Sequence, residues 1–460
     1  MRISPEDWHL IASRHGLSQA DTELLTFFAT SSEKLRTSEI KDHLGIRLSR
    51  PNVARRISRL VARGFLERTG SGPQTRYAIN ERQAVDAYLE TDRALRSRKP
   101  FDIARIRDYD PGHSRLIPAE IAEELRHISD AAIKAGDTIN QVVFRRYMVD
   151  FAWASSKMEG NTYSLLETQS LLENDTPAPD KSETEARMLR NHAAAIEYVI
   201  GNGRDLEITP HMIRGIHALL SKGLLPNPDD EGRIRRSPIA IGESIYRPET
   251  LPQVLEEGLR LISEKAEAIK DPYEASIFLL AQISYLQPFM DVNKRTARVA
   301  ANIPLLRAVL CPLSYYGMDD RAYIRGLIAY YETNTASLLM DSYRQGYLAA
   351  AERYRTYSEY LSDVIGRDDG DRRRQSERLV MQYIRAVVSH ETGPDERNQF
   401  LRNHIKTRDP GQRDTLLVSA SKAISNLSEA GAIGMGIPVS LLRRYREVLA
   451  AHDQESSRPD

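Results

Sequence analysis

The sequence predicts a mainly α-helical protein with two or three domains. Apolar residues recur at helical spacing along most of the chain, and strand-like alternation appears in only a few short stretches. A length of 460 residues exceeds what one compact core usually holds. Charged stretches such as "RALRSRKPFD" and "GRDDGDRRRQS" separate three predicted domains, residues 1–95, 119–362 and 376–450, joined by linkers at 96–118 and 363–375.

The composition is that of a globular protein, 41% hydrophobic and 28% charged. Lys+Arg and Asp+Glu are both 64, so a preference for nucleic acid or membrane would have to come from a local patch. The single cysteine, Cys311, excludes an intramolecular disulfide. The longest apolar stretch, "IFLLAQISYL", is about half of the ~20 residues that a membrane helix needs, and the first residues do not resemble a signal peptide. We therefore expect a cytoplasmic protein without membrane contact.

The first domain is expected to contain helices followed by a hairpin. "DTELLTFFAT" and "TSEIKDHLGI" have helical spacing, and we expect Thr37 to cap the second helix and Gly45 to stop it. A third helix, capped by Ser49, follows over "SRPNVARRISRLVARG". "FLERTGSGPQTRYAIN" then supplies two strands around a Gly-Pro turn. This order resembles a winged helix-turn-helix domain.

Arginine is concentrated in the same domain. Residues 50–76 hold seven arginines against one acid, Glu67. The side chains expected to contact DNA lie on the polar side of the third helix and beside the hairpin turn: Arg55, Arg56, Arg59, Arg63 and Arg76. The alternative is a solvated face of a protein-interaction module. A single winged helix usually needs dimerisation for a useful DNA site, so a homodimer is a further expectation.

The second domain carries the strongest chemical signal, in "QPFMDVNKR". This stretch lies between a buried helix, "DPYEASIFLLAQISYL", and a new helix, "RTARVAANIPLLRAVL". A loop that enters a helix N-terminus presents unpaired N–H groups and is a ready anion site. Asp291 is expected to hold Mg²⁺. The phosphate contacts are expected from Asn293, Lys294, Arg295 and Arg298.

This loop resembles the Fic/Doc family motif HxFx(D/E)GNxRxxR. Gln287 replaces the family's histidine, and Val292 replaces the usual Gly or Ala. The resemblance implies a helical core with a short β-hairpin flap, ATP and Mg²⁺ as cofactors, and a protein hydroxyl as the acceptor. AMP is the group moved by many members, whereas Lys294 matches kinases of the Doc type, so AMP and phosphate both remain open.

Two further stretches match the same family, and the resemblance covers roughly residues 125–355. "SSKMEGNTYSLLETQSLL" resembles the inhibitory helix (S/T)xxxE(G/N), whose residues here are Ser155, Glu159 and Gly160. The resemblance implies that Glu159 pairs with Arg298 and obstructs the γ-phosphate of the nucleotide. "EGRIRRSPIAIGESIYRPE" resembles the flap that binds a target by strand addition, with Ile239 and Ile241 alternating along it.

The two substitutions in the loop leave two hypotheses for function. Glutamine does not hold a proton near pH 7, and losing a general base costs on the order of 10²–10⁴-fold in rate. Val292 disfavours a positive φ, so the loop is expected to follow a different path. His211 and His217 are expected to be surface or core residues and Phe289 a core anchor. The chain is therefore a slow AMP- or phosphotransferase coupled to DNA binding, or a catalytically inactive DNA-binding regulator.

The third domain, residues 376–450, is expected to contain a second helix-turn-helix-like unit. "SERLVMQYIRAVVSH" has the spacing of an amphipathic helix, and "LLVSASKAISNLSEAGAI" resembles a helix-turn-helix with its recognition-type helix at 419–427. Lys422 is the one basic residue of that helix. Dimerisation or packing against the second domain is therefore favoured over direct DNA reading.

Overall fold

The computed structural model describes residues 3–31, 33–44, 50–134, 141–202 and 206–365, and beyond them 387–388, 399–400, 424, 442 and 444–448. Helices dominate these residues, which confirms the mainly α fold class. The domain predicted at 376–450 lies almost entirely outside the described residues, and so does most of the linker at 363–375. Every helix within the described ranges is too short or too polar to span a membrane.

The N-terminal unit, residues 3–89, has its own buried apolar cluster, in which Trp8 and Tyr88 are fully buried. The antiparallel strands pair from Leu66 with Ile79 to Thr69 with Arg76. Its elements in chain order are α1 Pro5–His15, α2 Gln19–Thr30, α3 Thr37–Leu44, α4 Arg50–Ala62, β1 Leu66–Thr69, the 3₁₀ turn Gly72–Gln74, β2 Arg76–Ile79 and α5 Glu81–Leu89. The predicted succession of helices and hairpin is present, framed by α1 and α5.

The capping predicted for α3 is wrong in one detail. Thr37 is the first helical residue rather than the cap. The carboxylate of Glu39 accepts a hydrogen bond from the Arg36 N–H at 2.7 Å, so an acidic side chain in the first turn satisfies the donor that precedes the helix. The predicted stop at Gly45 and cap at Ser49 lie outside the described residues.

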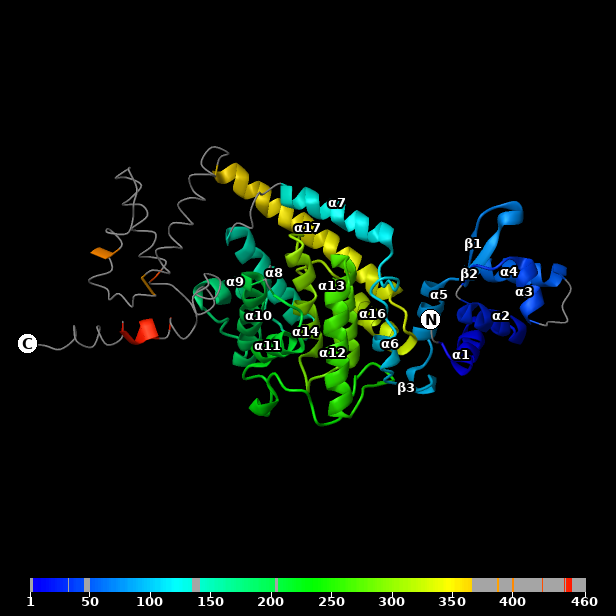
Figure 1. Ribbon diagram of the computed structural model, residues 1–460, viewed down its shortest axis with the longest axis horizontal. Helices are drawn as coiled ribbons and strands as arrows, with labels where there is room; N and C mark the ends of the chain where they lie inside the picture. The colour runs from blue at the N-terminus through cyan, green and yellow to red at the C-terminus, as the bar shows by residue number, and fades with distance from the viewer. Residues whose placement is uncertain are drawn as a thin grey trace, which may run out of the picture.

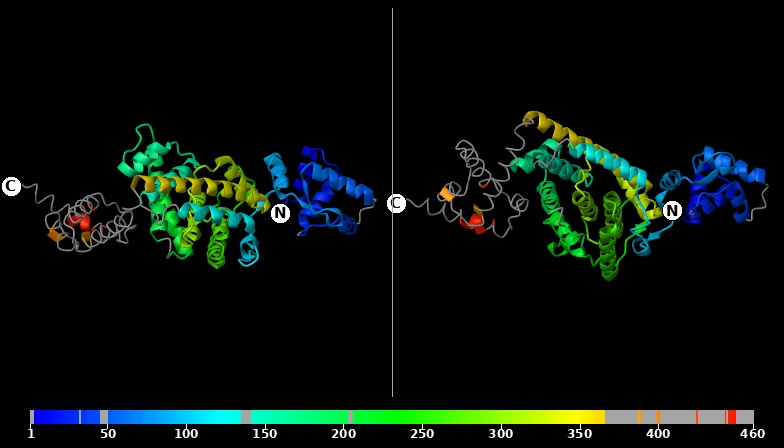
Figure 2. Two further views of the ribbon diagram at one scale, coloured as in Figure 1. Left: turned by 90° about the horizontal axis from the view of Figure 1, so that it is seen from above. Right: turned by 45° about the horizontal axis from the view of Figure 1, so that its top comes forward.

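The core unit, residues 101–356, surrounds α13, on which residues 273–286 are all buried. Helix α17 runs beside α7 and packs against α16 (Figures 1 and 2). The helices of this unit are α6 Ala104–Arg107, α7 Ala119–Lys134, α8 Gln141–Lys157, α9 Leu165–Asn174, α10 Glu183–Asn202, α11 Pro210–Ser221, the 3₁₀ turn Pro228–Asp230, α12 Pro252–Ala268, α13 Pro272–Leu286, α14 Asn293–Ala300, α15 Asn302–Arg307, α16 Asp320–Thr333 and α17 Ser337–Ile365, whose end extends past the unit.

The single helix predicted over 295–310 is divided into α14 and α15 at Ala301. Pro304 explains the division, because it has no N–H to donate to the carbonyl four residues earlier, that of Ala300. The short α14 therefore begins at the loop and ends after two turns, and it packs against α13 and α11.

A connector, residues 90–100, joins the two units and meets a segment that crosses the core surface, residues 233–250. The connector contains the 3₁₀ turn Arg93–Leu95 and strand β3, Lys99–Pro100. Strand β4, Tyr246–Arg247, pairs with β3 in parallel. Within residues 233–250, the Ser244 N–H donates to the Ile241 carbonyl at 3.2 Å and closes a turn. The segment expected to act as the flap thus contributes one turn and one strand, and the partner strand comes from the connector.

Candidate anion-binding site

The loop at residues 287–292 joins the C-terminus of α13 to the N-terminus of α14. Gln287 ends α13 in the left-handed conformation, with φ of 50°. Its side-chain nitrogen donates to the Ser284 carbonyl at 2.7 Å. The amide is therefore folded back onto the last turn of α13, and only 7% of Gln287 is exposed.

The expectation that Val292 would divert the loop from a positive φ is wrong. Val292 has φ of 64° and ψ of 8° and is buried in the core cluster. Its N–H donates to Asp291 Oδ1 at 2.6 Å, and its carbonyl accepts from the N–H and the hydroxyl of Thr296, both at 2.9 Å. Packing and three hydrogen bonds together hold a conformation that a β-branched residue disfavours on its own.

Asn293 braces the loop from within. Its Oδ1 accepts from the Phe289 N–H and its Nδ2 donates to the Phe289 carbonyl, each at 2.9 Å. Phe289 is fully buried, as expected of a core anchor. The structure thus turns the side chain of Asn293 toward the loop backbone, whereas the sequence suggested that it would face phosphate.

His217 supports the loop and has no free nitrogen to act as a base. Its ring stacks on Phe289 at 3.8 Å. The Gly232 N–H donates to Nδ1 at 2.9 Å, so Nε2 carries the proton and donates to the Asp291 carbonyl at 3.2 Å. Burial lowers the pKa of His217 to about 4, which keeps the ring neutral. His211, on the same helix, is exposed. Both fit the expectation that neither histidine replaces the missing base.

Helix α14 brings three cationic side chains together beside the loop. Lys294 is one-third exposed and lies 3.2 Å from Glu159. Arg295 is almost buried, and its Nη2 lies 3.7 Å from Asp291 Oδ2. The Nε and Nη1 atoms of Arg295 are buried and find no hydrogen-bond partner among the described residues. Buried donors usually have a partner, so these two atoms are available to an acceptor that the described residues do not supply.

Arg298 is fully buried and is held by the end of α8. Its Nη2 donates to Glu159 Oε1 at 2.7 Å and to the Ser155 carbonyl at 3.0 Å, and its Nε donates to the Ser155 hydroxyl at 2.8 Å. Burial alone would raise the pKa of Glu159, but the charges of Arg298 and Lys294 outweigh it and lower the pKa to about 2. Glu159 is therefore ionised at neutral pH.

The position of Glu159 differs from the expectation in one respect. Helix α8 ends at Lys157, and Glu159 lies in the turn that follows. Hydrogen bonds from the Glu159 N–H to the Ser156 carbonyl at 3.0 Å and from the Gly160 N–H to the Lys157 carbonyl at 2.9 Å form this turn. Gly160 has φ of 89°, a conformation that suits glycine and lets the chain leave the helix abruptly.

His192 on α10 fixes this arrangement from behind, and nothing in the sequence pattern pointed to it. Because the Ser155 hydroxyl accepts from Arg298, its own proton is available to His192 Nε2 at 2.9 Å. The Nδ1 atom then carries the ring proton and donates to the Met188 carbonyl at 3.1 Å. Burial, with the nearby charges of Arg295 and Arg298, lowers the pKa of His192 to about 3. A neutral ring therefore orients the serine that holds Arg298.

Arg235 is a second residue of the site that the sequence pattern does not indicate. It is 1% exposed, and its Nε donates to the Gln287 carbonyl at 2.8 Å. Its other guanidinium nitrogens donate to the carbonyls of Ser237 and Glu249. Residues 233–250 are thereby fastened to the first residue of the loop. The stretch "EGRIRRSP" has three arginines, and the pattern alone does not say which one is buried.

Ile239 and Ile241 follow Arg235 in the same segment. Both are partly exposed, and Ile241 packs against the core cluster. The expected alternation along a flap strand is not formed at these two positions, because the only strand of residues 233–250 is β4, which begins at Tyr246.

The residues present fit a polyphosphate with a divalent cation. The partnerless nitrogens of Arg295 and the first-turn N–H groups of α14 are donors for anionic oxygens. The side chain of Asp291 is 73% exposed, so its carboxylate is accessible to a cation from solvent although Oδ1 also accepts the Val292 N–H. No cluster of three or more acidic, histidine or cysteine ligands occurs in the part of the chain that the structure describes. A cation here would depend on Asp291 together with phosphate oxygens and water, as is usual for Mg²⁺.

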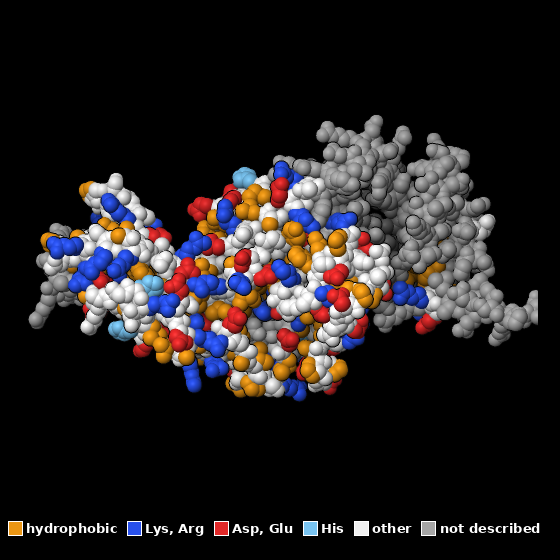
Figure 3. Space-filling model, turned by 180° about the vertical axis from the view of Figure 1, so that it is seen from behind, with side chains coloured by type: hydrophobic (Ala, Val, Ile, Leu, Met, Phe, Trp, Pro, Cys, Tyr) orange, Lys and Arg blue, Asp and Glu red, His pale blue; other side chains and the backbone are white. Residues whose placement is uncertain are grey.

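The arginines expected to meet DNA are only partly free. Arg56 Nη1 lies 3.1 Å from Asp21 Oδ1 and Arg59 Nη1 lies 3.7 Å from Asp21 Oδ2. Arg63 donates to the His15 carbonyl and Arg76 to the Lys34 carbonyl, at 3.1 and 3.0 Å. Arg55 is exposed. Lys and Arg side chains nevertheless gather on the visible face of the N-terminal unit, at the left of Figure 3.

Part of the core unit is similar to known proteins. Residues 207–305 match the model of the Fic/DOC family. The chain is 26% identical to protein adenylyltransferase fic-1 of Caenorhabditis elegans over 226 residues, which are 45% of this chain and 44% of that protein. It is 26% identical to protein adenylyltransferase Fic of Nematostella vectensis over 195 residues, 42% of this chain and 45% of that protein. The chain thus spans less than half the length of these curated relatives.

Solved structures resemble the chain more loosely. A structure of Fic-1 from C. elegans, residues 134–508, gives a TM-score of 0.47 at 17% identity and covers 73% of this chain and 98% of that one. A Fic family protein from Desulfovibrio desulfuricans G20 gives a TM-score of 0.42 at 17% identity and covers 69% and 92%.

Proposed function

We propose that this chain, whose residues 207–305 form a Fic/DOC family domain, binds ATP with Mg²⁺ at the loop of residues 287–292 and slowly transfers AMP or phosphate to a protein hydroxyl. The observation that carries the proposal is the pair of buried, partnerless nitrogens of Arg295 at the start of α14. The relatives named protein adenylyltransferase support the same reaction class.

Each side chain of the site has a separate task under this proposal. Arg295 and the first-turn N–H groups of α14 bind the phosphates, because they present donors and positive charge in a largely buried setting. Lys294 joins them once it leaves its ion pair with Glu159. Asp291 holds the cation at the exposed edge of the loop. Bound ATP would supply the activated group, and Mg²⁺ would neutralise part of its charge. The flap segment, residues 233–250, orients the acceptor.

No side chain of the site, as the structure describes it, is able to remove the proton from the acceptor hydroxyl. The amide of Gln287 accepts a hydrogen bond at most and is engaged with the Ser284 carbonyl. His217 and His192 are buried and neutral, with both ring nitrogens of each within hydrogen-bonding distance of protein groups. Positioning and charge stabilisation account for much of phosphoryl-transfer catalysis. Transfer is therefore slow and depends on the acceptor giving up its proton to water.

Substituting Arg295→Ala should weaken binding of ATP with Mg²⁺ by about 10- to 100-fold. The arginine contributes charge-assisted hydrogen bonds, each worth about 1.5–3 kcal/mol, and a tenfold change corresponds to about 1.4 kcal/mol. Isothermal titration of the full chain measures the effect. Arg260→Ala is the matched control, since Arg260 is an exposed arginine of α12 paired with Glu257 and Glu264. Equal affinities for the wild type and Arg295→Ala would contradict the proposal.

A second hypothesis is that the protein is a catalytically inactive regulator that binds DNA through its N-terminal unit. Gln287 favours it, because an amide does not take up a proton near neutral pH. Incubation with ATP labelled at the α- or γ-phosphate distinguishes the two hypotheses. Labelled protein supports transfer, and the position of the label identifies the group moved. Binding without label supports the regulator.

DNA binding itself is tested on α4. The double substitution Arg55→Ala, Arg59→Ala should weaken binding to duplex DNA and flatten its salt dependence by roughly two units in the slope of log K against log salt. Both side chains are exposed, whereas Arg56 is partly buried against Asp21. Fluorescence anisotropy at several salt concentrations measures the slope. Arg187→Ala, Arg260→Ala removes two exposed arginines of the core unit and should leave the slope unchanged. An unchanged slope in the α4 variant would remove α4 from the interface.

A further inference from the structure

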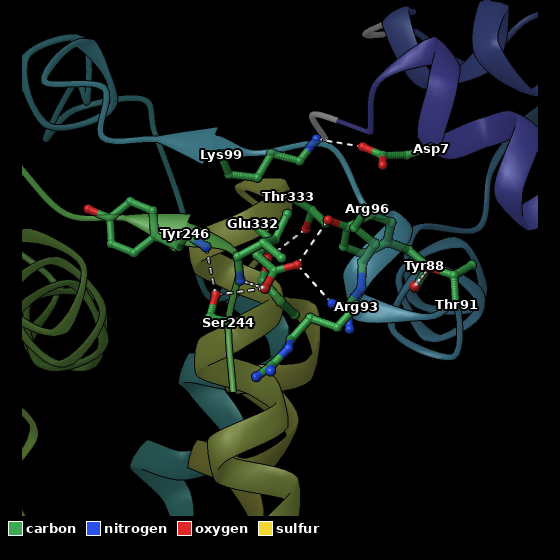
Figure 4. Close-up of polar contacts among 12 residues, drawn as sticks. Asp7, Tyr88, Thr91, Arg93, Arg96, Lys99, Ser244, Tyr246, Glu332 and Thr333 are labelled. Atoms are coloured by element: carbon green, nitrogen blue, oxygen red, sulfur yellow. Dashed lines mark hydrogen bonds and ion pairs between the residues drawn. The ribbon is translucent and has the colours of Figure 1, made fainter. Parts of the chain in front are cut away.

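One buried carboxylate, that of Glu332, lies where the N-terminal unit, the connector and the flap segment meet. Glu332 is close to the C-terminus of α16, and its side chain is fully buried. In Figure 4 the carboxylate lies between Tyr88 and Arg96 on one side and Ser244 on the other. Within the described part of the chain, the hydrogen bonds of this carboxylate do not reach the anion-binding loop, so the cluster is separate from the site described above.

The two oxygens of Glu332 serve different parts of the chain. Oε2 accepts from the Tyr88 hydroxyl and from Arg96 Nη1, both at 2.9 Å. Oε1 accepts from the Ser244 hydroxyl at 2.6 Å and from the Ile245 N–H at 3.1 Å. A carboxylate has about four acceptor positions, and these four donors fill them. One oxygen therefore faces the N-terminal unit and connector, and the other faces the flap segment.

Burial makes this carboxylate sensitive to the loss of any donor. The side chain of Arg96 is only 7% exposed, so the ion pair with Glu332 is shielded from water. An ionised group away from water needs its hydrogen bonds, because solvent does not replace a donor that moves away. Burial and the charge of Glu332 raise the pKa of Tyr88, which keeps its hydroxyl a donor. The arrangement is complete only when both sides are in place.

Tyr88 is anchored in the N-terminal unit by burial. Its ring is part of the apolar cluster of that unit. The connector is fastened to α1 as well, because Asp7 accepts from Lys99 Nζ at 2.6 Å and from the Ser97 N–H at 2.9 Å. A displacement of the N-terminal unit therefore moves both donors to Glu332 Oε2.

The connector and Glu332 both contact the flap segment. The guanidinium of Arg93 donates to the Gly242 carbonyl, and β3 pairs with β4 directly after the turn. The Ile245 N–H donates to Glu332 Oε1. The turn at residues 241–245 thus lies between two attachments that both belong to the junction with the N-terminal unit.

We propose that Glu332 is a positioning residue that couples the placement of the N-terminal unit to the conformation of the flap segment. The consequence of this coupling for catalysis rests on the proposed function, in which the flap segment orients the protein acceptor. A ligand that displaces the N-terminal unit from α16 removes two of the four donors, and the flap turn loses its ordered acceptor. Because such coupling is reciprocal, loosening the flap turn also loosens the connector.

Hydrogen–deuterium exchange of the full chain tests this coupling in two directions. Tyr88→Phe removes one hydroxyl in the N-terminal unit and should speed exchange about tenfold in peptides that cover 241–247. Ser244→Ala removes one hydroxyl in the flap and should speed exchange in peptides that cover 93–101. Glu332→Gln should do both, since an amide has one acceptor oxygen in place of two. Tyr343→Phe is the matched control, because Tyr343 donates to Ser276 at 2.9 Å inside the core unit.

The exchange experiment tests the coupling independently of the proposed transfer from ATP. Affinity for ATP with Mg²⁺ should be unchanged in Tyr88→Phe, so failure of the proposed transfer would leave the exchange result standing. Faster exchange confined to the segment that carries each substitution would overturn the coupling. Faster exchange at 241–247 in Tyr343→Phe as well would show general loosening and would overturn it too.

Discussion

Glu159→Gly should bind ATP with Mg²⁺ about 10- to 100-fold more tightly than the wild type. Arg298 and Lys294 are both paired with the carboxylate of Glu159, at 2.7 and 3.2 Å, so their charges are not free for phosphate. Removing the carboxylate releases both, and each charge-assisted hydrogen bond that they then form to phosphate is worth about 1.5–3 kcal/mol. Isothermal titration measures the difference in affinity.

The same substitution should lower stability when no nucleotide is present. It removes the carboxylate from the fully buried guanidinium of Arg298 and leaves the carbonyl and hydroxyl of Ser155 to hold it, and breaking a buried pair costs about 3–5 kcal/mol. Thermal unfolding should therefore show a lower Tm for Glu159→Gly than for the wild type. Added ATP should raise the Tm of the variant by more than it raises the Tm of the wild type. Glu159→Gln is the control, since it keeps an acceptor for Arg298 without the charge and should fall between the two. An affinity equal to that of the wild type would show that Glu159 does not compete with phosphate.

Gln287→His in the Glu159→Gly background should raise the rate of group transfer by on the order of 10²–10⁴-fold, the usual contribution of a general base. Histidine tolerates the positive φ that position 287 requires. The rate should rise with pH through about 6.5, because the neutral imidazole is the form that accepts a proton. Transfer of label from ATP to protein, followed at several pH values, measures both effects.

Gln287→Asn provides the matched control for this increase in rate. Asparagine keeps an amide and also tolerates the left-handed conformation, but it holds no proton near neutral pH. Its rate should stay at the level of Glu159→Gly alone. If Gln287→His and Gln287→Asn transfer label equally slowly, proton removal is not what limits this site.

The parts of the fold and site that could be predicted are those encoded over short distances in the sequence. Helix α2 follows from its apolar spacing, and α13 follows from apolar residues on all its sides after Pro272. The loop and its cations follow each other within a dozen residues, so the motif alone places Asp291 beside Arg295. The pairing of Glu159 with Arg298, 139 residues apart, came only from the family resemblance.

What could not be predicted depends on contacts between distant residues. Val292 adopts a positive φ because its burial and the hydrogen bonds of its N–H and carbonyl outweigh its own preference. Arg235 is buried and binds three backbone carbonyls, whereas its neighbours Arg233 and Arg236 are exposed, and the sequence does not distinguish the three arginines. Tyr88 and Glu332 meet across 244 residues. Such pairs are specified by packing, and hydrophobic periodicity carries no information about them.

The junction at Glu332 also bears on how such a chain could have been assembled in evolution. Fused domains are usually joined by linkers that few contacts cross, so either part can be exchanged by recombination. Here a breakpoint at residue 95 would separate Tyr88 from Arg96, and a foreign N-terminal unit would bring no phenol to Glu332. It would also bring no partner like Asp7 for Lys99. The two units are therefore expected to be inherited together, with residues 88–100 preserved as a shared joint.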